Sequence, residues 1–145
     1  NMDVRGFSHA LGESTIGFYA TPALARTLQG AFPATLDGAP LLLPGVEASV
    51  RGPLLRWIEA AGMRPRIVGE FDDSALMRAF AEAGAGIFPS ASMVGEQLCR
   101  QAGMVHLGNA DGVTETYYAI SVERRLTHPA VRAISEAATA KQKFV

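Results

Sequence analysis

The segment 64–89, RPRIVGEFDDSALMRAFAEAGAGIFP, constrains the fold more than any other part of the chain. It begins with a strand-like run, residues 66–70, which leads into an acidic helix cap. An amphipathic helix follows, and a turn of small residues then leads to a short apolar strand that should stop at Pro89. This order is typical of one strand–helix–strand unit of a parallel sheet. Such units bind ligands at the carboxyl ends of strands and the amino ends of helices.

The rest of the chain also alternates short apolar runs with helical stripes, which predicts an α/β fold with a mostly parallel sheet flanked by helices. Thr21 and Pro22 have the residue types of a helix N-cap and a first helical position. Strands are expected at 15–20, 40–44, 66–70, 87–88, 104–107 and 116–123, with a turn, GNADG, at 108–112. Three helices carry apolar residues expected to face the core: Leu54, Trp57, Ile58 and Ala61; Leu76, Ala79, Phe80 and Ala83; and Val94 and Leu98.

The charge and composition of the chain argue against direct nucleic-acid or membrane binding. The 145 residues include 13 basic and 14 acidic side chains, so the net charge is −1, whereas a nucleic-acid-binding surface needs a basic excess. No apolar run approaches the roughly 20 residues needed to span a bilayer, and the first ten residues contain no apolar core of a secretory signal. The single cysteine, Cys99, suits a reducing compartment. We therefore expect a soluble, cytoplasmic protein.

Four segments carry a resemblance to a known family: HALGESTIGFYATPALA, DGAPLLLP, the segment 64–89, and YYAISVERRLTHPAVRAI. In this order and spacing they resemble the effector-binding domain of LysR-type transcriptional regulators. The first and last resemble one subgroup, the NhaR-type activators linked to sodium/proton antiporter genes. The resemblance implies a lobe like those of type 2 periplasmic-binding proteins. It also implies a sensing function rather than catalysis.

The resemblance implies a division of the chain into two parts. Residues 1–113 correspond to the second lobe (RD-II) of the effector-binding domain. Residues 114–145 correspond to the strand and helix that return to the first lobe (RD-I). The rest of that lobe and the helix-turn-helix DNA-binding domain have no counterpart here, so we expect a fragment of a longer regulator.

In this family the effector lies in the cleft between the lobes, and the resemblance assigns one wall of that cleft to a turn after a buried strand and to the starts of later helices. From the residues alone, Pro44-Gly45 should leave backbone N–H groups exposed at a strand-to-helix junction, which favours anions or carbonyl oxygens. An ordinary strand-ending turn explains the same pair. The residues that match the family's cleft wall are Leu43, Pro44, Gly45, Val46, Phe71, Asp72, Ser74 and Pro89.

The polar residues after the strand 66–70 have two interpretations. Asp72, Asp73 and Ser74 could bind a cation or an effector, but helix capping explains them better. Glu70 could point into the cleft or lie at a solvated strand end. A sodium or lithium site would need several convergent oxygens. The acidic candidates for it are Glu70, Asp72, Asp111 and Glu115.

No combination of residues indicates an enzyme or a resident cofactor. His9, His106 and His128 lack the spacing of metal ligands. Cys99, on an amphipathic helix, favours buried packing over a reactive thiol. No phosphate loop and no convincing acid/base pair is present. The alternative to a regulator is a solute-binding or enzyme domain of a related two-lobed fold.

The expected partners follow from the resemblance. They are a small-molecule or ion effector, DNA only through the missing helix-turn-helix domain, and a second copy of the chain, with no membrane partner. The strand near 117–122 should lack its lobe-one neighbours and expose a pairing edge that another copy could cover.

Overall fold

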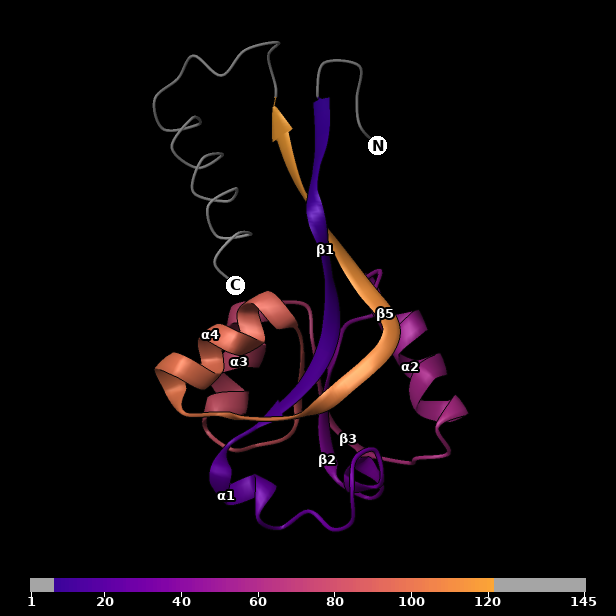
Figure 1. Cartoon of the computed structure of the whole chain (residues 1–145), viewed down its shortest axis with the longest axis vertical. Helices are drawn as coiled ribbons and strands as arrows, with labels where there is room; N and C mark the ends of the chain where they lie inside the picture. The colour runs from indigo at the N-terminus through magenta and orange to yellow at the C-terminus, as the bar shows by residue number, and fades with distance from the viewer. Residues whose placement is uncertain (1–6, 122–145) are drawn as a thin grey trace.

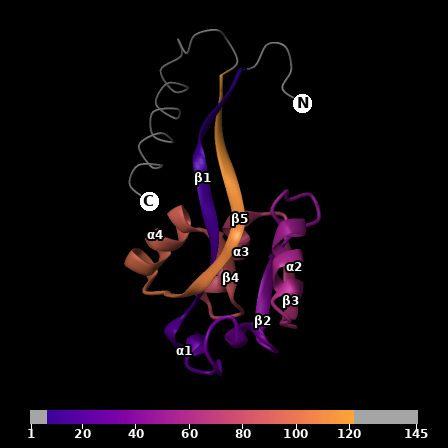
Figure 2. The ribbon, with the colours of Figure 1, turned by 45° about the vertical axis from the view of Figure 1, so that its right-hand side comes forward.

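The chain folds as an α/β protein in which helices cover both faces of the strands (Figures 1 and 2). The computed structural model describes the backbone of residues 7–121 and the side chains of residues 12–116. Within that range the elements are β1 (Phe7–Ala20), α1 (Pro22–Ala25), a 3-10 helix (Ala34–Leu36), β2 (Pro40–Pro44), α2 (Arg51–Ala60), β3 (Arg66–Phe71), α3 (Ser74–Glu82), β4 (Phe88–Ala91), α4 (Ser92–Ala102) and β5 (Val105–Ser121).

The strands form an antiparallel sheet, β4–β1–β5, and a parallel pair, β2–β3. A single parallel bridge between Leu41 and Ile87 joins them. The missing N–H of Pro89 explains why only one bridge forms between β2 and the segment that leads into β4. Ile87 donates its N–H to the Pro40 carbonyl, and the next residue that would donate toward β2 is Pro89, which has no N–H.

Two details differ from the expected sheet. β1 runs antiparallel to both of its neighbours, because it enters the body of the molecule along the path by which β5 leaves it (Figure 1). Pro89 does not end a strand but lies inside β4, opposite Phe18 of β1. The parallel arrangement holds for β2, β3 and the bridge at Ile87.

The core has two halves, because successive side chains of a strand point to opposite faces of the sheet. Leu41 and Leu43 of β2 are buried on one face with Leu54 of α2. Leu42, between them, is buried on the other face with Met77 of α3. Figure 2 shows the corresponding layers, with α2 on one side of the strands and α4 on the other. The continuous apolar run of β2 therefore reflects burial on both faces.

Helix α3 presents a different stripe to the core from the one expected. Met77 and Ala81 are buried, whereas Leu76 and Phe80 are 49% and 46% exposed. The helix is apolar over most of its circumference, so the i, i+4 spacing fits two adjacent stripes equally well. The prediction of an inward stripe of Leu76, Ala79, Phe80 and Ala83 is therefore wrong, and all four are exposed.

β5 is one strand of 17 residues, and the expected GNADG turn is absent. Residues 110–113 lie opposite Ile16 alone, so the segment forms a wide irregularity in a continuous ladder. Gly112 has a φ of 89°, which glycine adopts without strain. Ala110 and Val113 are buried against the α2 side of the core. The segment thus forms a bulge at Gly112 rather than a reversal of the chain.

Above the body, β1 and β5 continue as a two-stranded ribbon (Figure 1). Residues 7–14 of β1 pair there with residues 115–121 of β5. As far as Ser121, one edge of the strand expected near 117–122 pairs with β1, and β5 is the outer strand of the described sheet. The expectation that the other edge is open to a second copy stays a prediction. The helix expected after Pro129 lies outside the described residues.

The first helix begins as its sequence predicts. Thr21 is the N-cap, and its hydroxyl accepts a hydrogen bond from the Leu24 N–H at 3.2 Å. Pro22 occupies the first helical position. No helix in the described part of the chain is long and apolar enough to cross a membrane.

The observed face of α3 gives a direct test. Met77→Asp should lower the free energy of unfolding by at least about 3 kcal/mol, because it buries an unpaired carboxylate. Phe80→Asp makes the same charge change on the exposed face. It should cost no more than about 1.5 kcal/mol, since it removes mainly a contact with the Phe71 ring, whose centroid lies 5.2 Å away. Urea denaturation followed by circular dichroism measures both; equal losses would contradict the assigned face.

Candidate functional site

Three strands end at one edge of the structure, and a helix follows each of them. Pro44, the last residue of β2, pairs in parallel register with Phe71, the last residue of β3. β4 runs in the same direction and ends at Ala91, directly before α4. We call the region around Pro44, Phe71 and Ala91 the strand-end edge. Edges of this kind favour ligand binding, because helix N-termini and free strand ends converge there.

The turn after β2 packs against the segment after β3. Gly45 donates its N–H to the Phe71 carbonyl at 2.8 Å, so this N–H is not free for a ligand as the sequence had suggested. A Cβ on Gly45 would overlap the Asp72 carboxylate, which shows how closely the two segments approach. Val46, next in the turn, is 73% exposed. The structure therefore brings Pro44 and Gly45 together with Phe71 and Asp72.

Arg51, which the sequence analysis did not single out, organises this edge. Its Nη1 donates to the Pro44 carbonyl at 2.8 Å and lies 2.9 Å from Oε1 of Glu70. The Arg51 side chain is 19% exposed and that of Glu70 is 51% exposed. Glu70 is thus a partly solvated strand-end carboxylate held by an ion pair. No local sequence signal joins two residues 19 positions apart.

The acidic segment before α3 caps the helix through one residue. Asp73 is the N-cap, and its Oδ1 accepts from the N–H groups of Ala75 at 2.8 Å and Leu76 at 3.3 Å. The capping interpretation is therefore confirmed for Asp73. Asp72 and Ser74 are exposed, and their side chains make no hydrogen bond within the described part of the chain. Their oxygens remain available to a ligand.

Leu43 and Pro89, two other residues matched to the cleft wall, lie inside the protein. Leu43 is 1% exposed within the core, and Pro89 is buried in β4. Only their backbone could contribute to a site at this edge. Among residues 12–116, no group of three or more His, Cys, Asp or Glu side chains is placed to hold a metal ion.

The start of α4 is capped from a distant strand. Ala91, its N-cap residue, offers no side-chain hydrogen bond. Ser14 of β1 supplies one instead: its hydroxyl accepts from the Met93 N–H at 3.2 Å and lies 2.7 Å from the Ser92 hydroxyl. Ser14 is buried. Sequence reasoning missed this cap because Ser14 and Ser92 are 78 positions apart.

Two adjacent aspartates, one that caps α3 and one that does not, allow the assigned helix cap to be tested. Asp73→Ala should lower the free energy of unfolding by about 1 kcal/mol, because it removes the cap of α3. The matched variant Asp72→Ala should change stability by less than about 0.5 kcal/mol, as surface substitutions usually do. Chemical denaturation of both variants measures the difference. A larger loss for Asp72→Ala would show that the cap is wrongly assigned.

Comparisons with known proteins agree with this architecture. Residues 5–143 match the family model described as the LysR substrate binding domain. The transcriptional activator protein NhaR of Escherichia coli (strain K12) is 36% identical over 129 residues, which cover 88% of this chain and 42% of that protein. The chain thus spans less than half the length of this curated relative.

Solved structures show the same fold at lower identity. The AmpR effector binding domain from Citrobacter freundii has a TM-score of 0.63 at 21% identity, covering 99% of this chain and 70% of that one. The bromide-bound regulatory domain of HypT from Salmonella typhimurium has a TM-score of 0.63 at 15% identity, covering 99% and 68%. The periplasmic-binding-protein-like α/β fold is therefore confirmed. The matching relatives are transcriptional regulators rather than enzymes, and the chain belongs to the LysR substrate-binding domain family.

Proposed function

We propose that these residues form the second lobe of the effector-sensing domain of a LysR-type activator, and that the effector binds at the strand-end edge. The observation that carries the proposal is the meeting of Pro44, Gly45, Phe71 and Asp72 at one edge. Arg51 holds Glu70 there, and the oxygens of Asp72 and Ser74 are exposed. Leu43 and Pro89 belong to the same proposed site through their backbone. Val46 belongs to it as part of the turn that follows β2.

The proposed domain division is 1–113 for the second lobe and 114–145 for the return to the first lobe. The ribbon supports it, because β5 continues from the bulge at 110–113 without a break to Ser121 and extends above the body with β1 (Figure 1). In this arrangement β1 and β5 are the two strands that connect the lobes. The bulge at 110–113 lies on the body side of the proposed boundary.

The wider biological role follows from the family. The regulator would work in the cytoplasm as a homo-oligomer and would contact DNA through a helix-turn-helix domain outside these residues. The resemblance to NhaR-type activators makes sodium the first effector to test. The edge offers oxygens that suit a hard cation: the carboxylates of Glu70 and Asp72, the Ser74 hydroxyl and nearby backbone carbonyls.

A sodium response can be measured by amide NMR. Replacing potassium chloride with sodium chloride at constant ionic strength should shift the amide signals of residues 45–46 and 70–74. Glu70→Gln should abolish these shifts, because it removes a carboxylate ligand. Glu59→Gln is the matched control: Glu59 is an exposed residue near the other end of α2. Equal responses to the two cations, or shifts spread over the whole chain, would reject sodium as the effector.

The isolated 145-residue chain should show no specific DNA binding. Its net charge of −1 provides no basic surface to neutralise phosphates. Fluorescence anisotropy with duplex DNA, titrated across salt concentrations, tests this expectation. Submicromolar, sequence-specific binding at physiological salt would contradict the assignment of DNA contact to another domain.

A further inference from the structure

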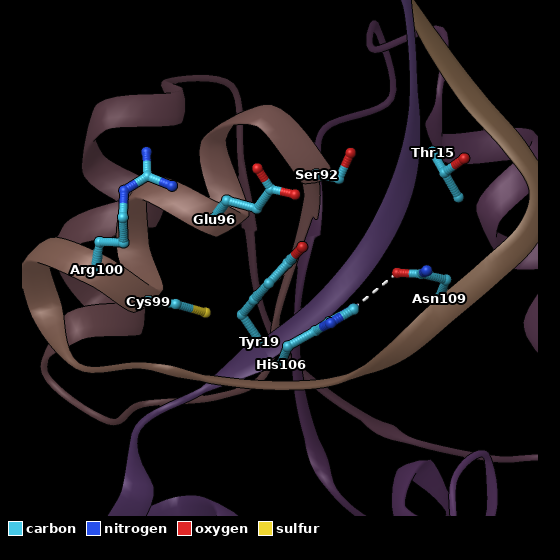
Figure 3. A pocket seen from close by; sticks show the side chains of 8 residues that line it. All are labelled: Thr15, Tyr19, Ser92, Glu96, Cys99, Arg100, His106 and Asn109. Carbon is cyan, nitrogen blue, oxygen red and sulfur yellow. Dashed lines mark hydrogen bonds between the residues drawn. The ribbon is translucent and has the colours of Figure 1, made fainter. Parts of the chain in front are cut away.

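A cavity of about 490 Å³ opens between α4 and the β1–β5 pair, and its lining includes none of the residues proposed to contact the effector (Figure 3). This volume is within the range of small-molecule sites. Its walls include Tyr19 from β1, Glu96, Cys99 and Arg100 from α4, and His106 and Asn109 from β5. The chemistry of this lining is polar and mixed in charge.

The buried Tyr19 side chain is held closely by its neighbours. Its ring stacks on His106, with centroids 4.8 Å apart and an interplanar angle of 18°. Gly95 of α4 also lies against the ring, since a Cβ there would overlap it. Tyr19 is 1% exposed, and its hydroxyl points into the cavity (Figure 3). This hydroxyl has no hydrogen-bond partner among the described residues, and it borders the open cavity, where a ligand can reach it.

Two further polar atoms gather beside that hydroxyl. Nε2 of His106 lies 2.7 Å from Oδ1 of Asn109. Because an amide oxygen only accepts, this contact is a hydrogen bond in the tautomer that carries the proton on Nε2. A Cβ on Gly17 would lie 2.8 Å from Asn109 Oδ1, 2.9 Å from the Tyr19 hydroxyl and 3.1 Å from His106 Nε2. All three polar atoms therefore meet over a glycine, which leaves room for them at the cavity floor.

The wall formed by α4 presents two opposite charges that do not pair. Glu96 and Arg100 are one helical turn apart, and both line the cavity. Arg78 and Glu82 of α3 have the same spacing and form an ion pair at 2.8 Å. Within the described residues Glu96 and Arg100 form none. The carboxylate and the guanidinium are thus both available to a ligand.

Burial keeps two of the lining groups, Tyr19 and Cys99, neutral at neutral pH. Burial, with smaller contributions from Cys99 and Glu96, raises the pKa of Tyr19 to about 12. Burial also raises the pKa of the Cys99 thiol, and Glu96 adds to the effect. Both groups therefore remain neutral, and Glu96 and Arg100 supply the charges.

We propose that this cavity binds a small zwitterion of the free amino acid class. The ligand's ammonium group would meet the Glu96 carboxylate and the oxygen of the Tyr19 hydroxyl, and its carboxylate would meet Arg100. A purely anionic ligand would be repelled by the Glu96 carboxylate, and it would have no positive group to pair with that carboxylate. A purely cationic ligand would be repelled by the Arg100 guanidinium in the same way. This site does not depend on the strand-end edge being the effector site, since the two share no proposed contact residue.

The test is a titration of the 145-residue chain followed by amide NMR. The twenty standard L-amino acids are screened first, and the strongest binder is compared with its decarboxylated amine and its deaminated acid. The amides of Tyr19, Gly95 and His106 should shift with the amino acid and far less with either analogue. Tyr19→Phe, which keeps the ring, should weaken binding about three- to tenfold, as expected for one lost hydrogen bond.

The charge variants Glu96→Gln and Arg100→Gln should each weaken binding by about tenfold, because hydrogen bonds to charged groups are the stronger ones. Arg78→Gln, on α3 and outside the cavity, is the matched control and should bind as the unmodified chain does. Three results would each overturn the proposal: no shift with any L-amino acid, equal binding of the amine or the acid alone, or unchanged affinity in both Tyr19→Phe and Glu96→Gln. Amide shifts confined to residues 45–46 and 70–74 would assign the ligand to the strand-end edge and would also overturn the proposal.

Discussion

The placement of β1 between β4 and β5 is the constraint on which the rest of the structure depends. Its side chains alternate between the two halves of the core: Phe18 packs on the α2 side and Tyr19 on the side of α3 and α4. Phe18 also contacts the rings of Phe32 and Trp57, at centroid distances of 5.7 and 5.8 Å. One strand thus supplies a central residue to each core, and its Ser14 caps α4. A shift of β1 by one residue would exchange the two faces and disrupt both cores.

The sequence predicted best those features that depend on local chemistry. The strand at 40–44 has the predicted bounds, because an uninterrupted apolar run between prolines has few alternatives. The face of α3 could not be chosen from the sequence, because Leu76, Met77 and Phe80 are all apolar and only tertiary contacts favour Met77. The GNADG segment has the composition of a turn. Because β5 pairs with β1 on both sides of this segment, the segment forms a bulge within a continuous strand.

The functional geometry depends mostly on contacts between distant segments, which the sequence does not reveal. The strand-end residues Pro44 and Asp72 could be brought together by reasoning, since parallel strands end at the same edge. The link between Arg51 and Glu70 could not be predicted, and neither could the stacking of Tyr19 on His106. Each of these pairs joins different strands or helices through side-chain geometry. They emerge only after the register of the sheet is known.

At the strand-end edge, where we propose that the effector binds, the ion pair between Arg51 and Glu70 would compete with a charged ligand. A cation that binds the Glu70 carboxylate competes with Arg51, whereas an anion that binds Arg51 displaces Glu70. Either exchange is energetically accessible, since solvent-exposed ion pairs contribute only about 0–1 kcal/mol. Arg51 keeps its hydrogen bond to the Pro44 carbonyl, so opening the pair need not release the turn after β2. The edge can therefore exchange a protein ion pair for a bound ligand while β2 and β3 stay in register.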